Sequence, residues 1–180
     1  MNELDEVQRK LLSDRVVAIF GPLDLQLAER VAGQMLYLEE LDATKEITLS
    51  LSTPGGSIPA GLEVLSTIAG LGPPLRTVCL ERCGGIATLL LAAGARGSRT
   101  ARKGARISID ELSPGGLANA PLEPLRKKLL ALFSTFTGQS EERIAQDATL
   151  GLELTAEGAR RYGLIDEVFD NAAPAVNQPL

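Results

Sequence analysis

The chain has 180 residues, of which 44% are hydrophobic and 3% aromatic, which is enough for a core built from aliphatic side chains. Its net charge of -5 and pI near 4.9 exclude the basic surface that nucleic acids require. The longest apolar run, residues 86–95, is too short to span a bilayer. We therefore expect a cytoplasmic protein with one domain at residues 1–170 and a flexible C-terminal tail at 171–180.

Strand and helix patterns alternate along the chain. An apolar run at 16–20 predicts a strand, Asp24 can cap the next helix, and alternating apolar and polar residues at 47–52 predict a strand covered on one face. The later predicted elements are a helix at 57–71, a strand at 76–80, a helix at 84–93, a strand at 105–109, helices at 125–136 and 156–162, and a strand at 164–169. Repeated strand–helix units predict an α/β fold with a largely parallel sheet.

Two glycine-rich turns are the candidate functional features. Gly55 and Gly56 lie between a predicted strand and a helix, where main-chain N–H groups point outward and glycine permits close approach of an oxyanion. Taken alone, such a turn is also compatible with a tight connection that binds nothing. Residues 82–88 have the same setting, in which a nucleophile can be held on a sharp turn. The chain contains no histidine, so the usual proton carrier of a hydrolase is missing.

The segments STPGGSIPAG, LLLAAGARG, FTGQS and AEGARRYGLID, taken together, resemble the proteolytic subunit of the ATP-dependent Clp protease. The resemblance covers residues 11–168 and implies a crotonase-like (ClpP) fold of repeated βαβ units, assembled into seven-membered rings that an AAA+ unfoldase serves. It places the serine nucleophile of the family at Gly85, its histidine at Asp110 and its aspartate at Gly151. The oxyanion-hole donors fall on the Gly55–Gly56 turn and on Ile86.

Because none of the three catalytic side chains is present, the resemblance implies a subunit without catalytic activity, similar to the ClpR-type paralogues. We expect a homo-oligomeric ring, a heptamer, or a mixed ring with an active paralogue, and a structural or regulatory role in ATP-dependent proteolysis. Another hypothesis is a crotonase-like enzyme that processes an acyl group or thioester with Asp110 or Cys83. Cys83 is also compatible with a small buried hydrophobe, and Asp110 and its neighbour Glu111 point to opposite faces of a strand.

The resemblance also bears on partners and ligands. The family's aromatic docking cleft for the unfoldase falls here on non-aromatic residues, which are Thr48, Ser50, Gly70, Thr100 and Arg102. Without aromatic anchors, and with a short segment before residue 11 in place of the axial hairpin, we expect weak or no direct docking. Residues 110–137 are about eight residues, or roughly two helical turns, shorter than the family pattern. This deletion either trims a loop or shortens the handle that joins two rings. Cys79 and Cys83 are too few for a disulfide framework or a four-ligand metal site, and we expect no cofactor.

Overall fold

The computed structural model describes residues 3–110 and 122–170. The predicted tail and the start of the shortened segment, residues 111–121, lie outside the described residues. The elements in chain order are α1 (Glu3–Ser13), β1 (Val16–Phe20), α2 (Leu25–Leu41), β2 (Ile47–Thr53), α3 (Ile58–Gly70), β3 (Leu75–Cys83), α4 (Ile86–Ala92), β4 (Arg99–Arg102), β5 (Arg106–Ile109), α5 (Leu122–Thr137), α6 (Glu141–Leu150), β6 (Leu152–Thr155), α7 (Ala156–Tyr162) and β7 (Glu167–Phe169).

A mostly parallel sheet forms the centre of the molecule, as the alternation of strands and helices predicts. Its strands run in the order β1-β2-β3-β4-β7 and all neighbours along this path are parallel. The end of β3 also pairs with β5, and β6 adds to β5 in the antiparallel direction. Strands β2 and β3 therefore lie inside the sheet, and both lead directly into the glycine turns.

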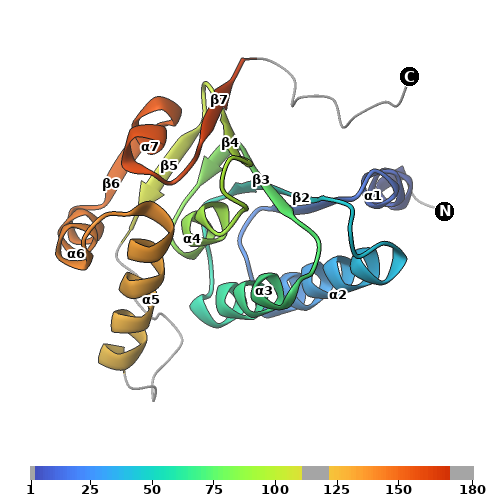
Figure 1. Ribbon diagram of the computed structural model, residues 1–180, viewed down its shortest axis with the longest axis horizontal. Helices are drawn as coiled ribbons and strands as arrows, with labels where there is room; N and C mark the ends of the chain where they lie inside the picture. The colour runs from blue at the N-terminus through green and yellow to red at the C-terminus, as the bar shows by residue number, and fades with distance from the viewer. Residues whose placement is uncertain (1–2, 111–121, 171–180) are drawn as a thin grey trace.

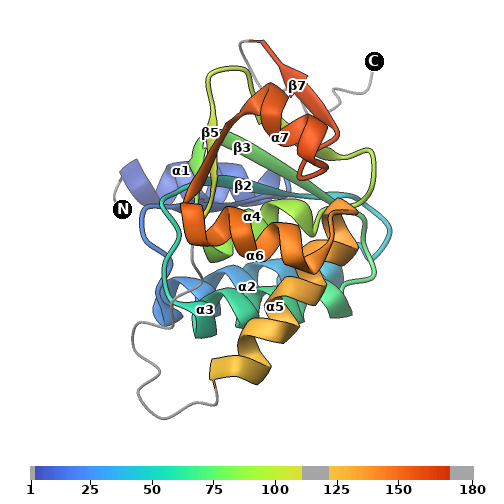
Figure 2. The ribbon, with the colours of Figure 1, turned by 90° about the vertical axis from the view of Figure 1, so that its left-hand side faces the viewer.

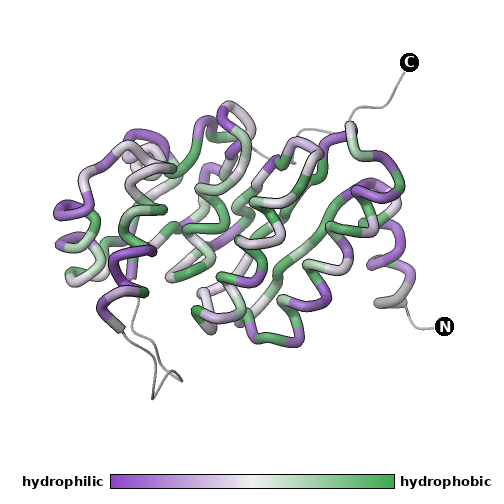
Figure 3. The backbone as a smooth tube through the Cα atoms, turned by 60° about the horizontal axis from the view of Figure 1, so that its bottom comes forward, coloured by the Kyte–Doolittle hydropathy of each residue, from purple (hydrophilic) through white to green (hydrophobic). Residues whose placement is uncertain are grey.

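Helices α2, α3 and α4 cover one face of this sheet (Figures 1 and 2). Helix α2 begins after Asp24, whose carboxylate accepts a hydrogen bond from the Leu27 N–H at 2.8 Å, so the predicted N-cap is confirmed. The side of α2 that faces the sheet carries buried aliphatic residues such as Val31 and Met35. Figure 3 shows the same alternation of hydrophobic green and hydrophilic purple along the helices.

Several predicted boundaries are wrong by a few residues, and one strand is much shorter than expected. The predicted strand at 164–169 is extended only over β7, because Gly163 ends α7 in the left-handed conformation and Asp166 turns toward Arg99. The predicted helix at 84–93 begins at Ile86, after a glycine turn. Strand β2 is not covered on one face alone, since Ser50 is only 7% exposed.

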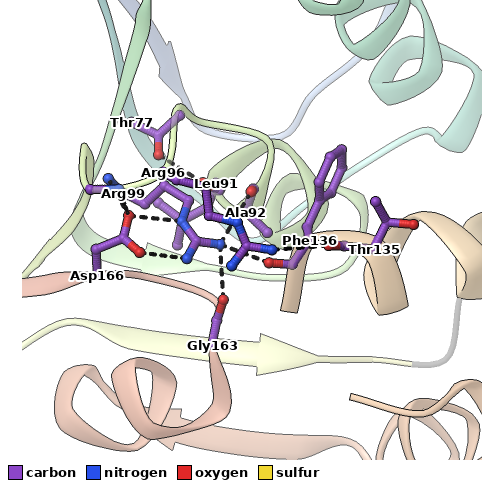
Figure 4. A network of polar contacts seen from close by, with 10 residues as sticks. Thr77, Leu91, Ala92, Arg96, Arg99, Thr135, Phe136, Gly163 and Asp166 are labelled. Carbon is purple, nitrogen blue, oxygen red and sulfur yellow. Dashed lines mark hydrogen bonds and ion pairs between the residues drawn. The ribbon is translucent and has the colours of Figure 1, made fainter. Parts of the chain in front are cut away.

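A buried arginine joins three parts of the chain (Figure 4). Arg99, at the start of β4, donates from Nε to Asp166 Oδ2 at 2.9 Å and from a terminal nitrogen to Asp166 Oδ1. Its other terminal nitrogen donates to the carbonyl oxygens of Phe136 and Gly163, both at 2.9 Å. These contacts connect β4 to the end of α5 and to the turn after α7. The Arg99 side chain is 3% exposed and the Asp166 side chain 23%, so the guanidinium is shielded from water and the carboxylate only partly so.

Candidate functional site

The first glycine turn follows β2 and packs closely on its surroundings. The Thr53 hydroxyl accepts from the Gly55 N–H and donates to the Gly55 carbonyl oxygen, both at 3.1 Å, which closes the turn. Leu23 bridges to it, with hydrogen bonds from Leu23 N–H to the Gly55 oxygen and from Ser57 N–H to the Leu23 oxygen. A Cβ on Gly56 would lie 2.1 Å from the Leu23 carbonyl oxygen. Only glycine therefore fits at Gly56 without moving the backbone.

The second glycine turn follows β3 and lies directly against the first. A Cβ on Gly55 would come within 2.7 Å of the Gly84 carbonyl oxygen, and one on Gly84 within 2.7 Å of the Pro54 oxygen. The two turns are adjacent because Thr53 and Cys83 are paired in the ladder between β2 and β3. Sheet register therefore brings the two predicted halves of the oxyanion-binding region together.

Gly85, where the resemblance places the nucleophile of the family, lies in a sharp turn between β3 and α4. Its φ of 51° and ψ of -128° differ from both helix and strand, and it is the N-cap residue of α4. A strained turn of this kind between strand and helix is how α/β-hydrolases expose a catalytic side chain. A Cβ on Gly85 would meet nothing within 4 Å. The site has room for a side chain that the sequence does not supply.

Replacing Gly85 with alanine tests whether the fold imposes this conformation. We expect Gly85→Ala to lower the free energy of unfolding by about 1–2 kcal/mol, because a Cβ disfavours positive φ even where space is open. Gly33→Ala is the matched control, since Gly33 also has open space but lies within α2 without a positive φ. It should raise stability by up to about 1 kcal/mol. Equal effects of both substitutions in urea unfolding would contradict the strained turn.

Asp110 lies beside Gly85, as the resemblance implies for these two positions. Its Oδ2 accepts from the Gly85 N–H at 2.9 Å and from the Ser108 hydroxyl at 2.7 Å. The half-buried Asp110 follows β5, whose pairing with the end of β3 brings it to the second turn. A carboxylate thus occupies the neighbourhood in which a catalytic base would stand.

The remaining predicted triad position, Gly151, directly precedes Leu152, which is paired with Ile109 in the antiparallel ladder of β5 and β6, so the register brings Gly151 close to Asp110. Gly151 ends α6 in the left-handed conformation, with its N–H donating to the Ala148 oxygen at 3.1 Å. Within residues 3–110 and 122–170, no hydrogen bond connects Gly151 to Gly85 or Asp110. In the same ranges, the N–H groups of Gly56 and Ile86 donate to no acceptor. The N–H groups of Gly56 and Ile86 are therefore still the predicted donors to an oxyanion.

Cys83 has the environment of a core residue. It is 1% exposed, and burial raises the pKa of its thiol well above the ordinary value, with a further contribution from the neighbouring thiol of Cys79. A nucleophilic cysteine requires the opposite shift toward the thiolate. The interpretation of Cys83 as a small buried hydrophobe is therefore supported, and its assignment as a nucleophile is not.

The residues expected in the unfoldase-docking cleft are only partly exposed. Ser50 and Thr100 lie in one row across the sheet, with Val78 between them, and are 7% and 3% exposed. Arg102 makes an ion pair with Glu81 at 3.7 Å. The other two, Thr48 and Gly70, lie on β2 and at the end of α3. This part of the sheet thus presents small polar side chains and one paired cation.

Sequence reasoning missed two hydroxyl residues that support the site. Ser108 donates to Asp110, and its position two residues earlier on an alternating strand was the available signal. Thr88, fully buried in α4, donates to the carbonyl oxygens of Ser108 and Cys83 at 2.7 and 3.1 Å. Thr88 therefore holds the start of α4 against both strands. Nothing in the local sequence around Thr88 indicated these long-range bonds.

Two adjacent glycine turns, each at the end of a parallel strand, place this chain among the α/β proteins whose strands end in turns able to present main-chain N–H groups. A comparison with protein-family models matches residues 1–172 to the family described as Clp protease. Because the match spans nearly the whole chain, this protein belongs to the Clp protease family. The resemblance and the crotonase-like α/β fold are thereby confirmed.

Members of this family typically assemble into oligomeric rings. In the described part of the chain, none of the helices combines the length and the apolar character needed to cross a bilayer. That the chain lacks catalytic activity, and that it assembles with an active paralogue, are still predictions.

Proposed function

We propose that this chain is a non-catalytic subunit of a Clp-type protease, which forms a ring alone or with an active paralogue. Its role is structural or regulatory in ATP-dependent proteolysis. The observation that carries the proposal is Gly85, which lies in the sharp turn where the resemblance places the nucleophile and has no atom that can attack a carbonyl. With no histidine in the chain, the imidazole of a serine protease is absent as well.

The charge of Asp110 supports the same proposal. Acyl transfer places a developing negative charge next to the turn, and catalytic sites stabilise it with N–H donors. Asp110 instead directs a carboxylate at the Gly85 N–H, 2.9 Å away. A tetrahedral anion held by the N–H of Ile86 would lie on the same turn as this carboxylate, and two negative charges in such proximity repel each other. Ionised Asp110 thus disfavours a tetrahedral anion at this position.

Exposed apolar side chains support assembly with other subunits. The outer side of α2 carries Leu36, Tyr37 and Leu41, each more than half exposed, and Phe20 at the end of β1 is 54% exposed. Apolar groups of this size in the open favour a protein interface. Ring closure needs complementary lateral faces and no catalytic group. The small polar residues Ser50 and Thr100 support the accompanying proposal that direct unfoldase docking is weak.

Activity and assembly measurements test this function together. We expect the purified chain to cleave a fluorogenic peptide no faster than buffer and to give no adduct with a fluorophosphonate probe. Native mass spectrometry, on the chain alone and mixed with the host's active paralogue, should show rings, and the paralogue's peptidase rate should change in the mixture. The active paralogue alone is the positive control.

Two results would contradict the proposal. A monomer in both native samples, with no effect on the paralogue, would exclude a role as a ring subunit. Hydrolysis of an acyl ester or thioester that disappears in Asp110→Asn would favour the crotonase-like enzyme, with Asp110 as its base.

A further inference from the structure

The most unusual feature of the sheet outside the glycine turns is an irregularity in β3. Cys79 is paired with Leu51 of β2, and Cys83 is paired with Thr53. Four steps along β3 therefore correspond to two steps along β2. The two extra residues must bulge out of the ladder, and Glu81 and Arg82 within this stretch are exposed.

This bulge brings two cysteines together that a regular strand would keep apart. Cα atoms four residues apart in a regular strand are about 13 Å apart, at about 3.3 Å per residue. Their ladder partners Leu51 and Thr53 are only two residues apart on β2, which is about 6.6 Å along a strand and close to the upper end of the roughly 4.4–6.8 Å between Cα atoms that a disulfide spans. The neighbouring thiol of Cys79 contributes to the raised pKa of Cys83, and both residues are at most 1% exposed.

We propose that Cys79 and Cys83 form an intramolecular disulfide when the protein meets a peroxide, which makes this buried pair a redox modification site at the base of the Gly84–Gly85 turn. One thiol sulfur bonds to a peroxide oxygen as the O–O bond breaks, which releases water and leaves a sulfenic acid. The second sulfur then attacks the first and displaces the second water. Two electrons pass from the thiols to hydrogen peroxide, and both thiol protons end in water.

The surroundings of Cys79 and Cys83 determine how fast the disulfide forms and what it does to the glycine turn. Burial raises the pKa of Cys83, so the closed fold holds it as a thiol and the reaction proceeds through local opening of the bulge. Cys83 directly precedes the Gly84–Gly85 turn, and its carbonyl oxygen accepts from Thr88 of α4. Once formed, the disulfide ties this turn to the middle of β3. The amides of the turn should then exchange hydrogen more slowly.

Trypsin offers a direct test, because Arg82 lies between the two cysteines and the flanking sites are Arg76 and Arg96. The folded protein is treated with hydrogen peroxide, its remaining thiols are blocked, and it is digested without reductant. We expect peptides 77–82 and 83–96 to be linked, at their summed mass less two hydrogen atoms, and to separate on reduction. Cys79→Ser and Cys83→Ser, checked for folding by circular dichroism, should give no linked pair.

Mixing ¹⁵N-labelled and unlabelled protein before oxidation distinguishes links within one chain from links between chains. Linked pairs in which both peptides carry ¹⁵N or neither does, formed in the absence of denaturant, support the proposal. It is overturned if the linked pair appears only when the protein is oxidised in denaturant, if mixed-isotope pairs predominate, or if the folded protein carries sulfenic or sulfinic acid without a link. Because these readouts use the wild-type chain, they remain decisive even where a serine variant fails to fold.

Discussion

The double variant Gly85→Ser/Asp110→His is expected to gain covalent labelling by a fluorophosphonate probe at residue 85, whereas the wild-type chain is not labelled. A Cβ at Gly85 meets nothing within 4 Å, so a serine fits there. The Asp110 carboxylate lies 2.9 Å from the Gly85 nitrogen, so an imidazole at that position comes within reach of the serine hydroxyl. Trapping by the probe, followed by peptide mapping, measures the gain.

Labelling is the suitable measurement because an incomplete triad is slow. Loss of the orienting aspartate lowers turnover by about 10⁴ in serine proteases, and Gly151 supplies no carboxylate. The control Gly85→Ala/Asp110→His has no hydroxyl and should remain unlabelled. If Gly85→Ser alone reacts as fast as the double variant, Asp110 acts as a base and the enzymatic alternative gains support. If neither reacts, these two positions do not face each other as the contacts imply.

Replacing Arg99 is expected to have the largest effect on stability. Arg99→Met leaves the Asp166 carboxylate without its bidentate partner and removes donors from the Phe136 and Gly163 carbonyl oxygens. Breaking a buried pair by removing one partner costs about 3–5 kcal/mol. For a protein of this size, this corresponds to a fall in melting temperature of roughly 10 °C. Differential scanning calorimetry at neutral pH measures it.

Arg102→Met is the matched control on the same strand. Arg102 pairs with Glu81 at 3.7 Å, and the two side chains are 42% and 71% exposed, so its loss should cost less than about 1 kcal/mol. Equal effects of the two substitutions would show that Arg99 does not hold the surrounding elements together.

Acid should weaken the ion pair between Arg99 and Asp166. Hydrogen bonds from Arg99 lower the pKa of Asp166 below its ordinary value, so the folded state favours the ionised carboxylate. The stabilisation is complete above the unfolded pKa of about 3.9 and is lost as the pH falls through the lower folded pKa. The stability gap between wild type and Arg99→Met should therefore narrow below about pH 4. A constant gap down to pH 2 would contradict this origin.

Local signals explain why much of the fold could be predicted. The strand at Val16–Phe20, the Asp24 cap and the helix at Ala156–Tyr162 are where the pattern places them, since each depends on neighbouring residues. Strands β4 and β6 were not predicted: β4, with the sequence RTAR, has no apolar alternation, and β6 has only four residues. Both strands are defined by pairing with other strands, β4 with β3 and β7 and β6 with β5, which is a tertiary effect.

By itself, the sequence determined that no histidine-based catalysis is available, that the core is aliphatic, and that glycines follow two of the strands. These properties belong to single residues or to short segments, so they hold in any fold. Only the tertiary structure decided which distant groups meet: Asp110 with Gly85, Arg99 with Asp166, and Cys79 with Cys83. Such pairs depend on the register between strands and on one bulge, and long-range pairing of this kind leaves no periodic signal in the chain.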